Sequence, residues 1–194
     1  MIRAKFLACL APAFALAGCI SFGADAPPSL LTLTPTATAS AGAGASGNAS
    51  TALVLSEFEA PARLDVTRVP VQVTDSEIAY LKDAVWVEKP ARLFRRLLAE
   101  TIRTRSSRVV IDGDDPGVLA GSRMGGTLRE FGYDAATSSV VVSFDAVRSG
   151  EGTAVTTRRF EARVPGVPAE AAPVGAALNQ AANDVAGQVA ACIG

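Results

Sequence analysis

The residue types that could do chemistry in this chain are few, because its 194 residues include no histidine. A Ser-His-Asp triad, a Cys-His pair and histidine metal ligands are therefore excluded. A serine–lysine dyad would need Lys82 or Lys89, and neither lysine lies beside a serine in a recognisable motif. Carboxylate pairs that form only in the folded chain stay open. The inventory predicts a protein that is not an enzyme and uses no cofactor.

Two short motifs match ligand-binding patterns in their letters but not in their context. Residues 42–47 (GAGASG) fit GxGxxG, yet a dinucleotide fingerprint needs a strand before it and a helix after it. Both flanks here are low in complexity. Asp112, Asp114 and Asp115 lack the spacing and the distal glutamate of an EF-hand calcium loop. We interpret the first motif as a loop and the second as a solvated turn, and we predict no metal site.

The third candidate is Cys19, which follows a segment typical of an export signal. Arg3 and Lys5 give it a positive start, and the apolar residues 6–16 are too few to span a bilayer, which needs about 20. Leu16-Ala17-Gly18-Cys19 resembles the lipobox of bacterial lipoproteins. In that class the signal is cut just before the cysteine, whose thiol carries diacylglycerol and whose new amino terminus is acylated. We expect a signal peptide over residues 1–18 and lipidation at Cys19, with stable anchoring by several acyl chains.

The residue after Cys19 bears on location. In lipoproteins of Gram-negative bacteria an aspartate at that place usually signals retention in the inner membrane. The resemblance, with Ile20 there instead, implies a lipid-anchored protein on the periplasmic face of the outer membrane.

The mature chain would have 176 residues, enough for one domain with its own core. Its 16 basic and 19 acidic residues give a formal charge of −3, which does not indicate binding to nucleic acid. Cys192 would be its only cysteine besides Cys19, so an internal disulfide is excluded. Cys192 falls on the apolar face of an expected helix, and we predict that it is buried and inert.

Hydrophobic periodicity predicts where the elements lie. Residues 19–29 read as a tether, residues 29–35 (SLLTLTP) as a brief strand, and residues 36–52, which lack large side chains, as a flexible loop. Leu128 and Phe131 are out of step within one strand, so a bulge is expected near Arg129. The remaining strands are expected over 52–58, 69–73, 76–82, 108–111, 122–134, 139–148 and 153–164, and the helices over 90–105 and 169–192.

Each helix has one apolar face. The expected core-facing positions of the first are Phe94, Leu97, Leu98, Thr101 and Ile102, and those of the second are Val174, Leu178, Ala181, Val185, Val189 and Cys192. The opposite face of the first helix is expected to be solvated, with pairs Glu88–Arg92 and Arg96–Glu100; it carries Arg92, Arg95, Arg96, Glu100 and Arg103. Strands precede each helix without regular βαβ alternation. The sequence therefore predicts a single α+β domain over 30–194, with a mostly antiparallel sheet and two main helices packed on it.

Several motifs occur in an order that resembles the ABC-type transport auxiliary lipoprotein family, also called the paraquat-inducible protein C-like family. They are residues 64–73 (LDVTRVPVQV), Glu77-Ile78-Ala79-Tyr80, Trp86, the helix from Pro90, SLLTLTP near the start, and Gly126-Thr127-Leu128 followed by Phe131. The resemblance covers most of residues 30–192. The chain departs from the pattern at Asp83-Ala84-Val85, where the family usually has basic or histidine residues.

The resemblance implies a non-enzymatic accessory of a lipid-transport system. Such lipoproteins act beside an ABC permease and ATPase and a periplasmic substrate-binding protein with a mammalian-cell-entry domain. We expect the lipid to fix the domain at the outer membrane while its surface docks the periplasmic partner. Tyr80 and Trp86 are the candidate contact residues, because amphipathic aromatic residues dominate interfaces; core packing is the alternative for Trp86. Homo-oligomerisation stays open, and the alternative function is a structural assembly lipoprotein of another cell-envelope complex.

Overall fold

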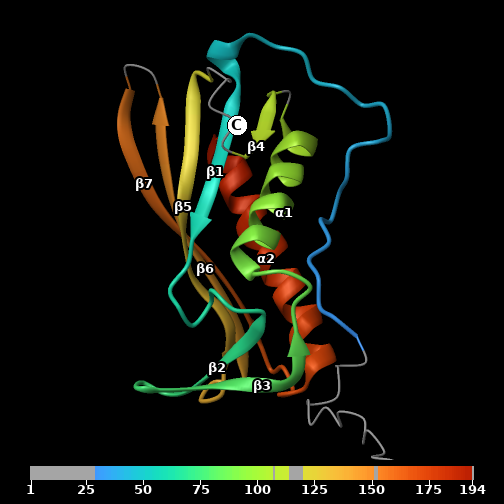
Figure 1. Cartoon of the computed structure of the whole chain (residues 1–194), viewed down its shortest axis with the longest axis vertical. Coiled ribbons are helices and arrows are strands. Elements are labelled where there is room, and N and C mark those ends of the chain that lie inside the picture. The colour runs from blue at the N-terminus through green and yellow to red at the C-terminus, as the bar shows by residue number, and fades with distance from the viewer. Residues whose placement is uncertain (1–28, 107, 114–119, 151–152, 194) are drawn as a thin grey trace, which may run out of the picture.

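The computed structural model describes residues 29–106, 108–113, 120–150 and 153–193. The predicted signal peptide and the predicted lipidation site, Cys19, lie outside these residues. Figure 1 shows two layers, a twisted sheet and a pair of helices that cover one of its faces. The predicted α+β class, with two helices on one sheet in a single domain, is confirmed.

Seven strands form the sheet, and β5 is its centre. One side of β5 pairs with β6 in antiparallel fashion along the whole strand. The other side takes β1 in parallel near the start of β5 and β2 in parallel near its end. The strands are β1 (Leu53–Glu59), β2 (Arg68–Thr74), β3 (Glu77–Val85), β4 (Val110–Asp112), β5 (Ser122–Asp134), β6 (Ser139–Gly150) and β7 (Thr153–Pro165).

The outer strands extend the sheet beyond these pairs. β3 lies antiparallel beyond β2, and β7 lies antiparallel beyond β6. β4 lies parallel to β1, and the long connection that parallel neighbours require contains β2, β3 and α1. The sheet is therefore mixed, with long antiparallel ladders and shorter parallel ones.

Helix α1 (Pro90–Arg105) begins and ends at the predicted residues, with Pro90 in its first turn. Helix α2 (Ala171–Ile193) begins two residues after its predicted start. Both helices present their apolar faces to the same side of the sheet (Figure 1). A 3-10 turn (Ala49–Thr51) precedes β1. No helix in the described ranges is long and apolar enough to cross a membrane.

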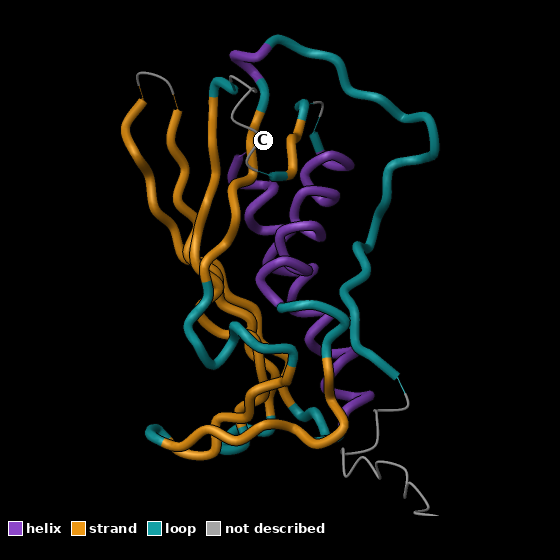
Figure 2. The backbone as a smooth tube through the Cα atoms, viewed as in Figure 1, coloured by secondary structure: helices purple, strands orange, loops and turns teal. Residues whose placement is uncertain are grey.

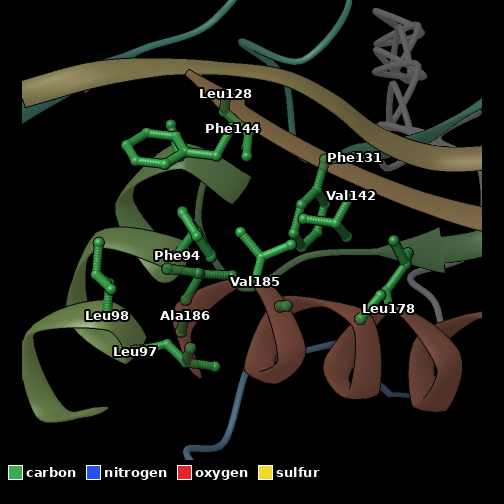
Figure 3. Packing of buried hydrophobic residues seen from close by; sticks show 14 of the residues in the cluster. Phe94, Leu97, Leu98, Leu128, Phe131, Val142, Phe144, Leu178, Val185 and Ala186 are labelled. Atoms are coloured by element: carbon green, nitrogen blue, oxygen red, sulfur yellow. The ribbon is translucent and has the colours of Figure 1, made fainter. Parts of the chain in front are cut away.

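The core lies between the two helices and the inner face of β5 and β6. Figure 3 shows Phe94 of α1 and Val185 of α2 facing Phe131, Val142 and Phe144 of the sheet. The rings of Phe94 and Phe144 lie 5.2 Å apart, and Phe58 of β1 lies 4.6 Å from Phe144. Burying several such side chains, each stabilising by about 1.5–3 kcal/mol, fixes the helices on the sheet.

Two side-chain predictions for the helices are wrong. Arg95 belongs to the buried set of α1, at 9% exposure, because its guanidinium reaches Asp112 at the end of β4. Cys192 is exposed, since the row Val185, Val189 and Ile193 continues the buried stripe at four-residue spacing and turns Cys192 outward. The expected pair Glu88–Arg92 forms at 3.9 Å, whereas Arg96 pairs with Glu88, at 2.6 Å.

The bulge in β5 and the segment before β1 were also predicted from local sequence. The register of β5 against β6 shifts between Leu128 and Glu130, which confirms the bulge near Arg129. The SLLTLTP segment makes only one bridge of a strand, between Leu31 and Trp86. Ahead of β1 the chain runs along the outside of the helices, as Figure 2 shows. We call residues 31–39 the strap, because Thr34 and Thr36 are hydrogen-bonded to α2 and Ala39 to α1.

Candidate functional site

The residues with potential chemistry do not converge on a reaction centre. Lys89 forms an ion pair with Asp65 at 2.8 Å on the surface, and Asp112 forms one with Arg95 at 3.1 Å. Residues 42–47 lie in a loop that follows no named strand and leads only into the short 3-10 turn at Ala49–Thr51, not into an α-helix. Within the described residues, no group of three or more histidine, cysteine, aspartate or glutamate side chains is placed to hold a metal ion.

The two candidate contact residues have different surroundings. Trp86 is 1% exposed and its ring lies 5.4 Å from that of Phe131, so core packing, the alternative considered for it, is what the structure shows. Tyr80 lies half-buried on β3, with the guanidinium carbon of Arg68 3.8 Å above its ring. Only Tyr80 is therefore placed where a partner could touch it.

A surface near Tyr80 is a better candidate for a functional site than the dispersed residues described above. The face of β5, β6 and β7 that points away from α1 and α2 carries no helix of the described residues (Figure 1). The β2–β3 hairpin lies at one end of this outer face, and between them is a hollow of about 480 Å³. Its lining combines apolar and charged side chains: Arg63, Pro70, Gln72, Asp75, Ile78, Glu130, Gly132, Tyr133, Asp134, Val141, Glu161 and Arg163.

Glycine at position 132 is what allows the hairpin to come this close. A Cβ atom on Gly132 would lie 2.5 Å from the carbonyl oxygen of Pro70, a separation that real Cβ atoms do not show. β2 therefore lies directly against the end of β5, where Val71 pairs with Tyr133. The hydroxyl of Tyr133 donates to the carbonyl of Val167, at 2.8 Å, and holds this end of the sheet to the chain before α2.

Ion pairs fix the charged rim of the hollow. Arg63 Nη2 lies 2.6 Å from Glu130 Oε1 and also donates to the carbonyl of Arg129. Arg163 Nη1 donates to Ser139 Oγ at 2.7 Å and lies 3.3 Å from Asp134 Oδ2. Hydrogen bonds, first from Thr137 and then from Arg163, hold the pKa of Asp134 below its usual value. The carboxylate is therefore ionised at neutral pH and its arginine is held in place.

A second pair continues the charged surface away from the hollow. Arg159 of β7 makes two hydrogen bonds to Asp145 of β6, at 2.6 and 2.8 Å, and Arg129 lies 3.6 Å from the same carboxylate. The hydrogen bond from Arg159 is the main reason that the pKa of Asp145 lies below its usual value. Alternating charges of this kind, held in fixed positions, suit recognition of another protein surface rather than bond-breaking chemistry.

Sequence reasoning missed this outer face, although the chain contains a signal for it. Arg159, Glu161 and Arg163 alternate along the predicted strand 153–164, so all three must point to one side of the sheet. The alternate positions, Phe160, Ala162 and Val164, share the opposite face, and their apolar side chains indicate that this face points to the core. Read together, the two sets predict a charged sheet face with no helix on it.

Comparison with known proteins gives the fold relatives of the chain. Residues 31–190 match the family model described as ABC-type transport auxiliary lipoprotein component. No curated protein matches the sequence. A crystal structure of a Xanthomonas campestris protein is similar with a TM-score of 0.68 at 17% identity, over 84% of this chain and 92% of that one.

Two further solved structures are similar at lower identity. A crystal structure of an uncharacterized protein gives a TM-score of 0.65 at 13% identity, over 86% of this chain and 100% of that one. The PelC dodecamer from Paraburkholderia phytofirmans gives 0.43 at 12% identity, over 76% and 91%. The first two crystal structures share the fold described above.

Proposed function

The chain belongs to the family of ABC-type transport auxiliary lipoprotein components, and from this premise we propose that it docks a periplasmic partner of a lipid-transport system. The partner proposed is a substrate-binding protein with a mammalian-cell-entry domain, which works with an ABC permease and ATPase. The lipoprotein itself performs no catalysis. It is anchored in the outer membrane through a lipid on Cys19 and holds its domain in the periplasm.

The observation that carries this proposal is the division of the domain into two faces. The strap crosses the helix side: Thr34 N donates to Asn179 Oδ1 and Thr36 N to Asn183 Oδ1, both at 2.8 Å. Ala39 N donates to Glu100 of α1 at 2.6 Å. The chain that leads to the anchor therefore occupies the helix layer, and the outer face of the sheet is left for a partner.

The outer face also has the composition of a docking surface. Ile78 is 40% exposed on the β2–β3 hairpin, beside the paired charges described above, and Val155 is 64% exposed farther along the sheet, near the start of β7. Apolar residues surrounded by ordered polar ones are the usual composition of a protein interface. Tyr80, on the same hairpin, stays the aromatic contact candidate. We propose that the partner contacts the hairpin and the adjoining end of the hollow.

Site-specific crosslinking tests the proposal. A photoreactive amino acid at Ile78 or Tyr80, in cells of the native host, should capture a protein with a mammalian-cell-entry domain. The same amino acid at Asp184, which is exposed on the helix side, should capture it much less. Capture of β-barrel assembly proteins from Ile78 and Tyr80, with no mammalian-cell-entry protein, would overturn the proposal in favour of a structural assembly role.

A further inference from the structure

Two arginines share a hollow at the end of the molecule opposite the hairpin. Arg108, just before β4, and Arg148, near the end of β6, line a hollow of about 240 Å³. Four hydroxyl residues line it with them: Ser50, Ser122, Ser149 and Thr156. None of the described lining residues is acidic. The hollow thus combines two positive charges with several hydrogen-bonding groups.

The fold positions Arg108 and Arg148 without pairing either one with an acidic side chain of the described residues. Arg108 donates to the carbonyls of Thr51 and Ile193, each at 3.2 Å, and to Ser122 Oγ at 2.9 Å. All three acceptors are neutral. Arg148 stands in the ladder opposite Thr156 of β7. No ion pair joins either arginine to a carboxylate of the described residues.

The positive charges of Arg108 and Arg148 repel each other across the hollow. Burial, first, and the charge of Arg148, second, lower the pKa of Arg108. A bound anion would reverse the second effect, because both guanidinium groups would then face a negative charge. Phosphate suits such a place well, since its oxygens accept paired hydrogen bonds from guanidinium groups and single ones from hydroxyls.

A small apolar hollow adjoins the charged one. It shares Arg148 and Thr156 with it and is otherwise lined mainly by carbon-rich side chains, including Met124, Phe160 and Val189. Its volume is about 60 Å³. Inorganic phosphate would use only the charged hollow, whereas a phospholipid would also place part of its apolar chain region in the second one.

We propose that Arg108 and Arg148 form a binding site for a phosphate group, and that the adjoining apolar hollow favours the phosphate ester of a lipid over inorganic phosphate. The site lies at the other end of the sheet from the hairpin, where β1 begins and β6 ends (Figure 1). It does not depend on docking at the outer face, and either proposal can fail alone.

The test uses the full mature lipoprotein in a non-ionic detergent, with two probes. They are inorganic phosphate and dihexanoylphosphatidylglycerol, a short-chain phospholipid used below its critical micelle concentration. Both should raise the melting temperature in a saturable, salt-sensitive way, because a ligand of the folded state stabilises it. Arg148→Gln should weaken each by about tenfold or more, as expected for one charged hydrogen-bonding partner. Arg92→Gln, the same charge change on exposed α1, should leave both affinities unchanged.

Cys192 offers a local readout for the source of the phosphate. It lines the apolar hollow, and Arg158 Nη1 lies 3.3 Å from its sulfur. The phospholipid should slow alkylation of Cys192 by a maleimide, and inorganic phosphate should not. Saturable binding of phosphate with no protection of Cys192 by the lipid would support the anion site and overturn the lipid assignment.

A clear negative result is also available. No saturable binding of either probe, or wild-type affinity in Arg148→Gln, would overturn the site. Because Arg108 holds neighbouring backbone, Thr156→Val serves as the second variant in place of Arg108→Gln, and we expect it to weaken binding less than Arg148→Gln. Crosslinking from Ile78 should be normal in Arg148→Gln, which separates failure of this site from failure of partner docking.

Discussion

Arg95 carries its charge on the face of α1 that packs against the sheet. Its Nη1 lies 3.1 Å from Asp112 Oδ1, and the side chains are only 11% and 21% exposed. These two atoms make no well-aligned hydrogen bond to each other or to another described group. Glu57 Oε1, at 3.9 Å from Nη2, belongs to a side chain that is 68% exposed. The attraction between Arg95 and Asp112 is therefore mainly one of charge in a poorly solvated place.

Replacing Asp112 by asparagine should lower the stability of the fold. Arg95 would keep its charge and lose its main partner, so the free energy of unfolding should fall by about 2 kcal/mol, between the values typical of exposed and buried pairs. Urea unfolding measures the change. Asp65→Asn, which removes the exposed partner of Lys89, should cost less than about 1 kcal/mol. Equal losses in the two variants would show that Arg95 is adequately solvated.

Asp134 and Asp145 on the outer face should make the free energy of unfolding depend on pH. The pKa values of Asp134 and Asp145 are lowered in the folded state. Their contribution is complete above the unfolded pKa, about 3.9, and is lost as pH falls toward the lower folded values. Unfolding free energy should therefore be steady from pH 7 to about 5 and decline below about 4.

Asp145→Asn isolates one of these groups. The variant loses the two hydrogen bonds from Arg159 to a charged acceptor. It should be less stable than the wild type at pH 6, and the difference should shrink toward pH 3, as measured by urea unfolding at each pH. A difference that is constant from pH 6 to pH 3 would contradict the assigned pKa direction.

At the scale of elements, β5 depends on glycine where it passes the aromatic core. A Cβ atom on Gly126 would lie 2.3 Å from the carbonyl oxygen of Asp145 and 2.5 Å from the ring of Phe144. Gly126→Ala should therefore destabilise the fold by about 3 kcal/mol, the upper range for overpacking. The neighbouring Gly125→Ala is the matched control, because its nearest atom is Ser56 Cβ at an ordinary 3.9 Å. Thermal unfolding of both variants should rank them clearly, and equal melting temperatures would refute the clash.

After the backbone bridge at Leu31, the strap is held by side chains of the two helices. Asn183 accepts from the amide and the hydroxyl of Thr36 and donates to the carbonyl of Thr34. In Asn183→Ala, hydrogen exchange at the amide of Thr36 should become much faster while amides within α2 keep their protection. Gln188→Ala, which removes a different bond from α2, to Glu161, should leave the strap unchanged. Simultaneous loss of protection in α2 would mean that strap and helix unfold together.

These elements also show what sequence can predict and what it cannot. The bounds of α1 and the bulge near Arg129 were predictable, because apolar spacing and Pro90 are local signals. The parallel pairing of β1 and β2 with β5 was not, since alternation is the same whichever neighbour a strand takes. Arg95 and Cys192 were misplaced for a related reason: their burial depends on β4 and on where the sheet ends. The outer face was predictable only in part, from the alternating charges of β7.

For the whole molecule, the lipid anchor is the prediction with the widest effect. Cys19→Ala should leave the domain folded, with a wild-type melting temperature, because the residues of the core cluster lie between Leu31 and Ile193. The protein should leave the outer-membrane fraction, because two or more acyl chains are needed for stable attachment. Membrane fractionation and mass spectrometry of the mature amino terminus check this. A variant that stays in the outer membrane, or an unmodified terminus at another residue, would contradict lipid anchoring at Cys19.

The strap has a mechanical consequence if the chain is anchored at Cys19 as proposed. A pull on the chain ahead of Ser29 loads first the two backbone hydrogen bonds of Leu31, with Val85 and Val87, and then the bonds at Thr34, Thr36 and Ala39, before it reaches β1. Their rupture would free about 22 further residues, or up to ~75 Å of extended chain, without opening the sheet. Under the proposed anchoring, a change in the distance between the membrane and the bound partner would therefore lengthen this segment first and leave the folded domain intact.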